Sequence, residues 1–206
     1  MSLSPYTSEL GVSRAKHLLR RACFHYNKTL LYQISSLNVD QALDLLFSDN
    51  TISYAQPYDP LPTDSPHGYW LESTEYPPDM PNQGRKRGLL AQWWFYNMVN
   101  RNNIKDKLLF FLHTTFTISS GDIGASHYLY DHLRLLDYFS SGNLKELAQK
   151  ITLDNAMLNY LDNTQNNANN PNENYAREFL ELFTITKGEQ IGEGDYSTYT
   201  RIGIND

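Results

Sequence analysis

Apolar residues recur at helical spacing along most of this chain, whereas the strict alternation that a half-buried strand requires is nearly absent. In segment 39–47, for example, the apolar side chains share one helix face, and Asn38 stands where an N-cap belongs. Because such a face must be buried against other helices, the pattern predicts an all-α fold, an irregular multi-helix bundle with little or no sheet. We expect helices over residues 13–22, 28–37, 39–47, 84–100, 104–117, 126–139, 144–153, 155–161 and 171–184.

Two stretches interrupt the helical pattern. Most of the nine prolines, with several tyrosines and Trp70, fall within residues 48–83. Proline ends helices, so this stretch is predicted to be a long loop or lid, and its aromatic rings favour packing onto the body of the protein. Residues 188–206 show no clear period and are predicted to be an irregular tail. A chain of 206 residues can bury a sufficient core, and we expect residues 1–206 to form a single helical domain.

Composition and charge exclude several classes of protein. The formal net charge of −6 argues against broad binding to a phosphate backbone, so no nucleic-acid partner is expected. No apolar run approaches the roughly 20 residues of a membrane span, and the chain is expected to be soluble as it stands. The single cysteine, Cys23, excludes an internal disulfide. The P-loop, HExxH, GxSxG and CxxC motifs are absent, but an enzyme built on scattered carboxylates and histidines is not excluded.

The stretch PNENYAREFLELFT, residues 171–184, has two interpretations. Asn170, Pro171 and Glu173 fit the N-cap, N1 and N3 positions of a helix. Arg177 can pair at i,i+4 spacing with acidic residues on either side, and the apolar residues fall on the opposite face. A capped, amphipathic helix with a solvated polar face therefore explains most of the stretch, whereas a polar site would use the same residues.

Histidine and asparagine supply further candidates. His113 lies in the apolar segment LLFFLHTTF, where a buried ring either finds a polar partner or serves in a site, and the pattern favours the first. His127 and His132 are five residues apart rather than four, which does not suit a pair of zinc ligands on one helix. Residues 155–174 contain nine asparagines, which stabilise turns and also offer oxygen ligands to Ca²⁺. Without the spacing of a calcium loop, turns are favoured.

Three segments of the chain together resemble one bacterial family. They are HLLRRACFHY (17–26), KDKLLFFLHTTFTIS (105–119), and ITLDNAMLNYLDN followed by PNENYAREFLELFTITKG, which ends at Gly188. The family is known as domain of unknown function 1800, and the resemblance covers nearly the whole chain. Family members are typically longer and often exported. The resemblance therefore implies an N-terminal portion or a truncated member, with a C-terminal region absent, and it leaves the native compartment unknown.

The polar signature of the family falls on the stretch discussed above. It matches Asp162, Asn163, Pro171, Asn172, Glu173, Asn174, Arg177, Glu178 and Glu181. Helix capping explains Glu173, but it does not explain why a family would specify Asn172, Asn174 or Arg177. The resemblance thus implies that these residues form a site or a buried polar network as readily as a solvated face.

Two hypotheses of different class follow. In the first, the protein is a hydrolase-like or metal-dependent enzyme, with His113, Glu178 and Glu181 as catalytic candidates. In the second, it is a structural or partner-binding protein, whose Tyr- and Pro-rich stretch is the contact surface. The candidate binding residues under either hypothesis are Asp162, Asn163, Asn172, Glu173, Asn174 and Arg177. The residues slightly favour the second hypothesis, with a protein partner or the absent C-terminal half as the occupant, and they leave metal, cofactor and small-molecule substrate unknown.

Overall fold

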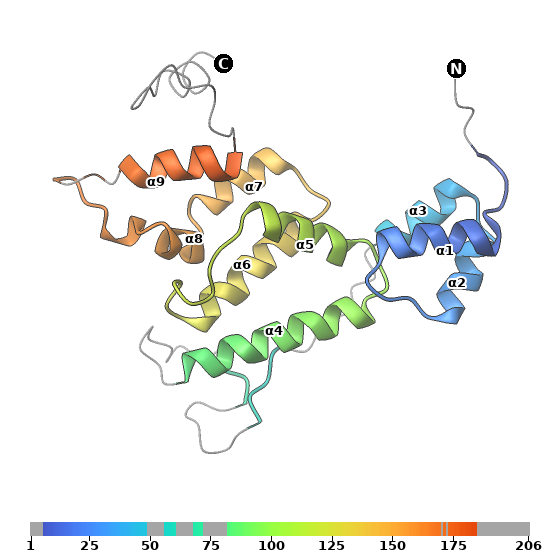
Figure 1. The fold of residues 1–206 in the computed structure, drawn as a ribbon, viewed down its shortest axis with the longest axis horizontal. Coiled ribbons are helices and arrows are strands. Elements are labelled where there is room, and N and C mark those ends of the chain that lie inside the picture. Colours follow the sequence, from blue (N-terminus) through green and yellow to red (C-terminus); the bar gives the residue numbers. More distant parts are fainter. Residues whose placement is uncertain are drawn as a thin grey trace, which may run out of the picture.

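The computed structural model describes residues 6–48, 56–60, 68–71, 82–169, 171 and 173–184. These residues form helices and no strand, so the predicted all-α class is confirmed; one isolated antiparallel bridge joins Asp59 to Gly68. The tail predicted over 188–206 and most of the loop predicted over 48–83 lie outside the described residues. The elements, shown in Figure 1, are α1 (Gly11–Ala22), α2 (Lys28–Ser35), α3 (Val39–Phe47), α4 (Gln83–Asn100), α5 (Lys105–Thr115), α6 (Ser126–Tyr138), α7 (Leu144–Ile151), α8 (Asn155–Tyr160), the 3₁₀ turn η1 (Asn163–Gln165), α9 (Glu173–Glu178) and the π-helical turn η2 (Phe179–Thr184).

The first three helices pack around an apolar cluster of their own. α2 begins after Asn27, whose side chain accepts a hydrogen bond from the Leu30 N–H at 2.8 Å. α3 begins at the predicted N-cap, where the Asn38 side chain accepts from the Gln41 N–H and the Gln41 side chain accepts from the Asn38 N–H. We call residues 6–48 the N-terminal unit. Its buried residues are Leu10, Ala15, Leu19, Ala22, Cys23, Ile34, Ala42 and Leu46.

The remaining helices are arranged around α6, and together with residues 56–60 and 68–71 we call them the body. α4, α5 and α8 all pack against α6. The inward stripe of α6 consists of Leu129, Leu133 and Leu136, at the spacing that one helix face requires. The apolar core of the body continues from this stripe through the other helices to Phe179 and Phe183, at the end of the described chain.

Residues 56–60 and 68–71 are fixed to the start of α4 by buried polar contacts. Asp59 is fully buried and accepts hydrogen bonds from the Arg85 guanidinium on both carboxylate oxygens, while Lys86 Nζ lies 3.5 Å from Asp59 Oδ2. Lys86 Nζ also lies 5.2 Å from the ring centroid of Trp70, whose indole N–H donates to Ser126 Oγ at 3.2 Å. Trp70 is fully buried. The prediction that aromatic rings of residues 48–83 pack onto the body is therefore confirmed for Trp70.

The N-terminal unit meets the body beside the turn between α4 and α5. The Ile104 N–H donates to the Leu46 carbonyl at 3.3 Å, and the Ile104 side chain packs against the apolar cluster of the N-terminal unit. Phe24 makes an edge-to-face contact with Phe110 at 5.7 Å between ring centroids, and Lys107 Nζ lies 4.0 Å from the Phe24 ring centroid. The described chain thus has two apolar clusters, and the single domain expected for the whole chain stays a prediction.

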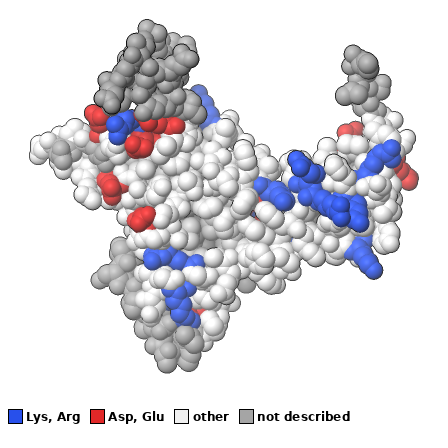
Figure 2. Space-filling model, viewed as in Figure 1, with Lys and Arg blue, Asp and Glu red and all other residues white. Residues whose placement is uncertain are grey.

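Charged side chains are distributed unevenly over the surface. Figure 2 shows Lys and Arg gathered over α1, where Arg14, Lys16, Arg20 and Arg21 are exposed. The Asp and Glu side chains visible in the same view gather mainly over α9. Among the helices that the structure describes, none is both long enough and apolar enough to span a bilayer.

Candidate functional site

The predicted signature helix forms α9 and continues into η2, with a polar face at the surface. Arg177 donates to Asn174 Oδ1, and its Nη2 lies 3.3 Å from Glu178 Oε1. The side chains of Arg177 and Glu178 are 32% and 28% exposed, so this pair is in contact with solvent. Glu173 and Asn174 are exposed and Glu181 is half-buried. Three predicted site residues are therefore brought together, but on the outside of the molecule.

The opposite face of α9 holds the helix to the body. Phe179 and Phe183 are buried in the body core. The Tyr175 hydroxyl donates to the Thr152 carbonyl at 2.8 Å, just after the end of α7. Burial, with a smaller contribution from the negative charge of Asp154, raises the pKa of Tyr175 to about 12, so the phenol keeps its proton as a donor. This face positions α9 and carries no free reactive group.

The asparagine-rich approach to α9 forms turns in its described part. Asp162 adopts the left-handed conformation with φ of 57°, and Asn163 Oδ1 accepts a hydrogen bond from Asn166 Nδ2 at 3.0 Å. Asn172, also a predicted binding residue, lies outside the described residues, as does the predicted cap Asn170. Across the described part of the chain, no group of three or more His, Cys, Asp or Glu side chains is placed to hold a metal ion.

A buried histidine–aspartate pair lies inside the body, and it was not predicted from the sequence. His132 on α6 is fully buried; its Nδ1 lies 2.9 Å from Asp154 Oδ2, and its Nε2 lies 3.1 Å from the Phe116 carbonyl oxygen. A carbonyl only accepts, so Nε2 is the donor to Phe116, and the remaining contact joins Nδ1 to the carboxylate. Asp154 also accepts from the Met157 N–H at 3.0 Å, as the N-cap of α8.

The signal for this pair was present in the sequence. His132 falls within the apolar stripe of α6, next to Leu129, Leu133 and Leu136, where a polar residue must find a buried partner. Asp154 precedes a short helix at an N-cap position. The pairing of the two residues depends on how α6 and α8 cross, which the sequence pattern does not show.

His113 on α5 lies next to this pair. Its ring makes edge-to-face contacts with Trp94 at 5.1 Å and with His132 at 5.8 Å between centroids. Its Nδ1 is buried and has no hydrogen-bond partner among the described residues, unlike the satisfied core histidine favoured from the sequence. Burial, with a smaller contribution from the charge on His132, lowers the pKa of His113 to about 4. The imidazole is therefore neutral at neutral pH.

A cavity of about 220 Å³ opens beside His113. Its walls come from α4, α5, α6 and the segment between α5 and α6. The lining residues are Arg87, Ala91, Trp94, His113, Ile118, Ser120, Leu129 and Leu133. The Trp94 indole N–H is also buried without a hydrogen-bond partner in the described part of the chain. None of these lining residues is a carboxylate, so the structure does not bring Glu178 or Glu181 to the cavity at His113.

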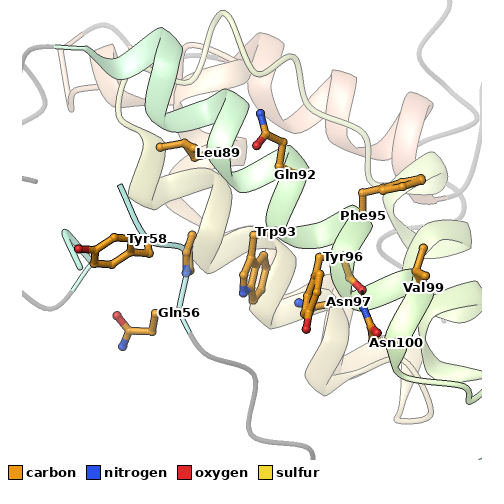
Figure 3. A pocket seen from close by; sticks show the side chains of 11 residues that line it. Gln56, Tyr58, Leu89, Gln92, Trp93, Phe95, Tyr96, Asn97, Val99 and Asn100 are labelled. Carbon is orange, nitrogen blue, oxygen red and sulfur yellow. Dashed lines mark hydrogen bonds between the residues drawn. The ribbon is translucent and has the colours of Figure 1, made fainter. Parts of the chain in front are cut away.

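A second, larger pocket lies on the other side of α4, with a volume of about 580 Å³ (Figure 3). It is open, and its surface is mainly apolar. Trp93 and Tyr96 point to the same side of α4, facing the segment that carries Gln56 and Tyr58. The lining residues are Gln56, Pro57, Tyr58, Leu89, Gln92, Trp93, Phe95, Tyr96, Asn97, Val99 and Asn100. None of them is charged, and Asn97 Oδ1 is buried without a partner among the described residues.

The far end of α4 holds a cluster of charges between the two units. Arg101 Nη1 lies 2.5 Å from Asp137 Oδ1 and 3.5 Å from Asp106 Oδ1. Burial raises the pKa of Asp106 to about 6, although the positive charge of Arg101 acts in the opposite direction. Burial, assisted by the nearby Asp106, also raises the pKa of the Cys23 thiol to about 11. Cys23 is therefore a protonated, buried thiol at neutral pH and is no candidate nucleophile.

Comparison with protein families identifies a family for this chain. The family model described as "Protein of unknown function (DUF1800)" matches residues 17–202, which is most of the chain. Comparison with curated proteins and comparison with solved structures returned no match.

Proposed function

The chain belongs to the DUF1800 family, and we propose that it is a partner-binding protein whose open pocket beside α4 binds an extended, uncharged, proline-containing segment of another protein. The observation that carries this proposal is the pocket of about 580 Å³, whose described lining consists mainly of aromatic rings and side-chain amides and includes no charged residue. Its size falls within the roughly 300–1,000 Å³ of ligand-binding clefts.

The aromatic residues of this pocket are unusually accessible. Tyr58, Phe95 and Tyr96 are 52%, 68% and 64% exposed, and all three line the same open pocket. Contiguous exposed aromatic surface is uncommon on a protein that binds nothing, and tyrosine, tryptophan and phenylalanine are enriched where proteins meet. The pocket therefore has the composition of an interface rather than that of ordinary surface.

The chemistry of the lining favours a proline-containing peptide. Proline-rich segments form a polyproline II helix without internal hydrogen bonds, and they dock in grooves lined by aromatic rings. Their free carbonyl oxygens can accept hydrogen bonds from the side-chain amide of Gln92, which is exposed at the pocket. The mainly apolar surface suits pyrrolidine rings better than the hydroxyl groups of a sugar.

The enzyme alternative has less support from the described residues. It requires His113 to act with Glu178 or Glu181, and the cavity at His113 is lined by no carboxylate. Arg177 is paired with Asn174 and Glu178 at the surface rather than directed into a cleft. A metal-dependent reaction that uses these residues stays a prediction.

The test is a titration of the full chain with short, uncharged, proline-rich peptides, followed by tryptophan fluorescence. Tyr96→Ala should weaken binding by about tenfold or more, which corresponds to roughly 1.4 kcal/mol or more for an aromatic contact at the centre of an interface. Tyr138→Ala is the matched control, because Tyr138 is 79% exposed on α6 and does not line the pocket. Absence of peptide binding, or equal weakening by both variants, would overturn the proposal. Binding of neutral oligosaccharides in place of peptides would overturn the class of partner.

A further inference from the structure

We propose that the exposed faces of α1 and α5 form one surface that docks on an anionic phospholipid bilayer. Phenylalanine rings enter the interfacial layer of the bilayer, and Lys and Arg side chains contact the lipid phosphates. We call this the basic aromatic surface, and it is centred on Arg20, Arg21, Phe24, Lys107, Phe110 and Phe111. None of these residues lines the open pocket beside α4, so the surface is separate from the site proposed for the peptide.

The exposed face of α1 is basic. The buried stripe of this helix is apolar, and helical spacing places Lys16, Arg20 and Arg21 on the opposite side, where all three are exposed. Residues 10–39 contain five Lys or Arg side chains and no Asp or Glu, although the whole chain has a formal net charge of −6. Figure 2 shows Lys and Arg gathered over α1. A local concentration of positive charge of this kind attracts an anionic surface.

Exposed phenylalanine rings lie beside this basic face. Phe110 and Phe111 are 44% and 63% exposed, and they share the solvent side of α5 with Lys107, three and four residues before them. Phe24, which is 40% exposed and follows α1, joins the two helices. Its ring makes the edge-to-face contact with Phe110, and Lys107 Nζ lies 4.0 Å from its centroid. Adjacent exposed aromatic rings indicate a binding surface rather than ordinary surface.

The acidic residues of this region do not belong to the exposed faces of α1 and α5. Asp106 of α5 is 2% exposed and lies 3.5 Å from Arg101. Glu9 precedes α1, and Asp40 and Asp44 belong to α3. The basic aromatic surface therefore presents positive charge and apolar rings together.

This combination fits a bilayer better than other anionic partners. At a membrane interface, apolar rings enter the boundary of the acyl chains, while Lys and Arg stems lie along apolar surface and their charged ends reach the phosphates. Lys107, whose ammonium lies over the Phe24 ring, already has this arrangement. An acidic peptide would satisfy the charges but not the rings. A bilayer also touches only one end of the molecule, and the acidic side chains over α9 lie at the end opposite α1 (Figures 1 and 2).

The test is co-sedimentation of the full chain with lipid vesicles. Vesicles of equal parts phosphatidylcholine and phosphatidylglycerol should bind the protein at least about tenfold more tightly than vesicles of phosphatidylcholine alone, and added sodium chloride should remove most of this difference. This readout does not depend on the folding of any variant. Equal binding to both vesicles, or sedimentation with neither, would overturn the proposal. Tighter binding to polyglutamate than to the mixed vesicles would also overturn it, in favour of an acidic protein.

Charge-reversal variants then locate the surface. One basic residue near an anionic membrane strengthens binding by about fivefold, so Arg20→Glu combined with Arg21→Glu should weaken binding to the mixed vesicles by at least about 25-fold. Lys145→Glu combined with Lys150→Glu is the matched control, because it makes the same change of charge at exposed positions of α7. This control should change the affinity by less than about threefold. Equal losses in the two double variants would overturn the assignment to α1.

A second pair of variants tests the rings. Phe111→Ser should weaken binding to the mixed vesicles by about tenfold, because its ring no longer enters the interface. Tyr138→Ser is the control, since Tyr138 is 79% exposed on α6 and lies outside the basic aromatic surface, and it should leave the affinity unchanged. Unchanged binding of Phe111→Ser, or the same loss in both variants, would show that the rings do not enter the bilayer and would overturn the proposal.

Discussion

The N-terminal unit and the body bury different kinds of residue. Every buried side chain in the described part of the N-terminal unit is apolar or the Cys23 thiol. The body also buries polar and charged side chains, namely Asp59, Lys86, Asn97, Asn103, Asp106, Ser126, His132, Ser140 and Asp154. Apolar burial is non-directional, whereas hydrogen bonds and ion pairs impose particular distances and angles. The open pocket beside α4 and the cavity at His113 both lie in the body, next to these directional contacts. We therefore expect peptide binding to depend on the part of the molecule whose interior contains polar and charged side chains.

The largest loss of stability is expected when one member of the buried His132–Asp154 pair in the body is removed. Asp154→Ala leaves His132 Nδ1 without its partner and removes the N-cap of α8. Because a buried ring nitrogen loses its partner and α8 loses its cap, we expect the free energy of unfolding to fall by about 3–5 kcal/mol, measured by urea denaturation. Asn143→Ala is the control, since Asn143 caps α7 at an exposed position and should cost about 1 kcal/mol. Similar losses in both variants would contradict a special role for the pair.

The next test removes apolar contacts from the N-terminal unit. Leu19→Ala empties part of a fully buried position on α1, and we expect a loss of about 3 kcal/mol. Native-state hydrogen exchange should show the loss of protection mainly in residues 6–48, because the unit has its own apolar cluster. Val12→Ala, at a half-exposed position of the same helix, should have little effect. Equal loss of protection throughout the body would show that the two clusters unfold as one.

A smaller effect is expected from pH. Asp106 and His113, both in the body, should change the free energy of unfolding in opposite directions as the pH rises. The raised pKa of Asp106, about 6, gives a contribution that is complete below the ordinary value of 3.8 and is lost as the pH rises through about 6. The lowered pKa of His113, about 4, gives a contribution that is complete above 6.5 and is lost as the pH falls through about 4.

Variants at these positions should separate the two signs. Relative to the unsubstituted protein, Asp106→Asn should become more stable as the pH rises from 4 to 7, whereas His113→Gln should become more stable as it falls over the same range. Urea midpoints at several pH values measure both trends. Curves that stay parallel to that of the unsubstituted protein would contradict the assignment of the pH response to these residues.

The smallest effect is expected on the polar face of α9. Arg177→Ala removes contacts to Asn174 and Glu178 that are partly exposed, so the free energy of unfolding should fall by less than about 1 kcal/mol. A loss of 2 kcal/mol or more, the range of about 2–4 kcal/mol expected for a buried network, would show that this face behaves like the interior of the body. Thermal and urea denaturation of the variant would distinguish the two results.

Local patterns in the sequence predicted the fold class and several local features. Helical spacing, the N-cap at Asn38 and the turns around Asp162 each depend on residues close together in the chain. The sequence did not identify the pair of His132 with Asp154, which are 22 residues apart and meet only because α6 and α8 pack together. Nor could it show the two pockets, because their walls come from separate segments of the chain. His113 was a catalytic candidate from the sequence; one of its ring nitrogens is buried without a hydrogen-bond partner among the described residues, and its role stays a prediction.

The hydrogen bond from Ile104 to Leu46 has a consequence for the order in which the chain assembles. Ribosomes add residues from the N-terminus at roughly 5–20 per second, so the N-terminal unit is made several seconds before Ile104 exists to pack against it. During that interval one apolar edge of the unit stays exposed to water. Its later docking closes a long loop, an entropic cost that grows slowly with loop length and delays such contacts relative to local helix formation. We therefore expect the junction at Ile104 to form after the helices of the N-terminal unit.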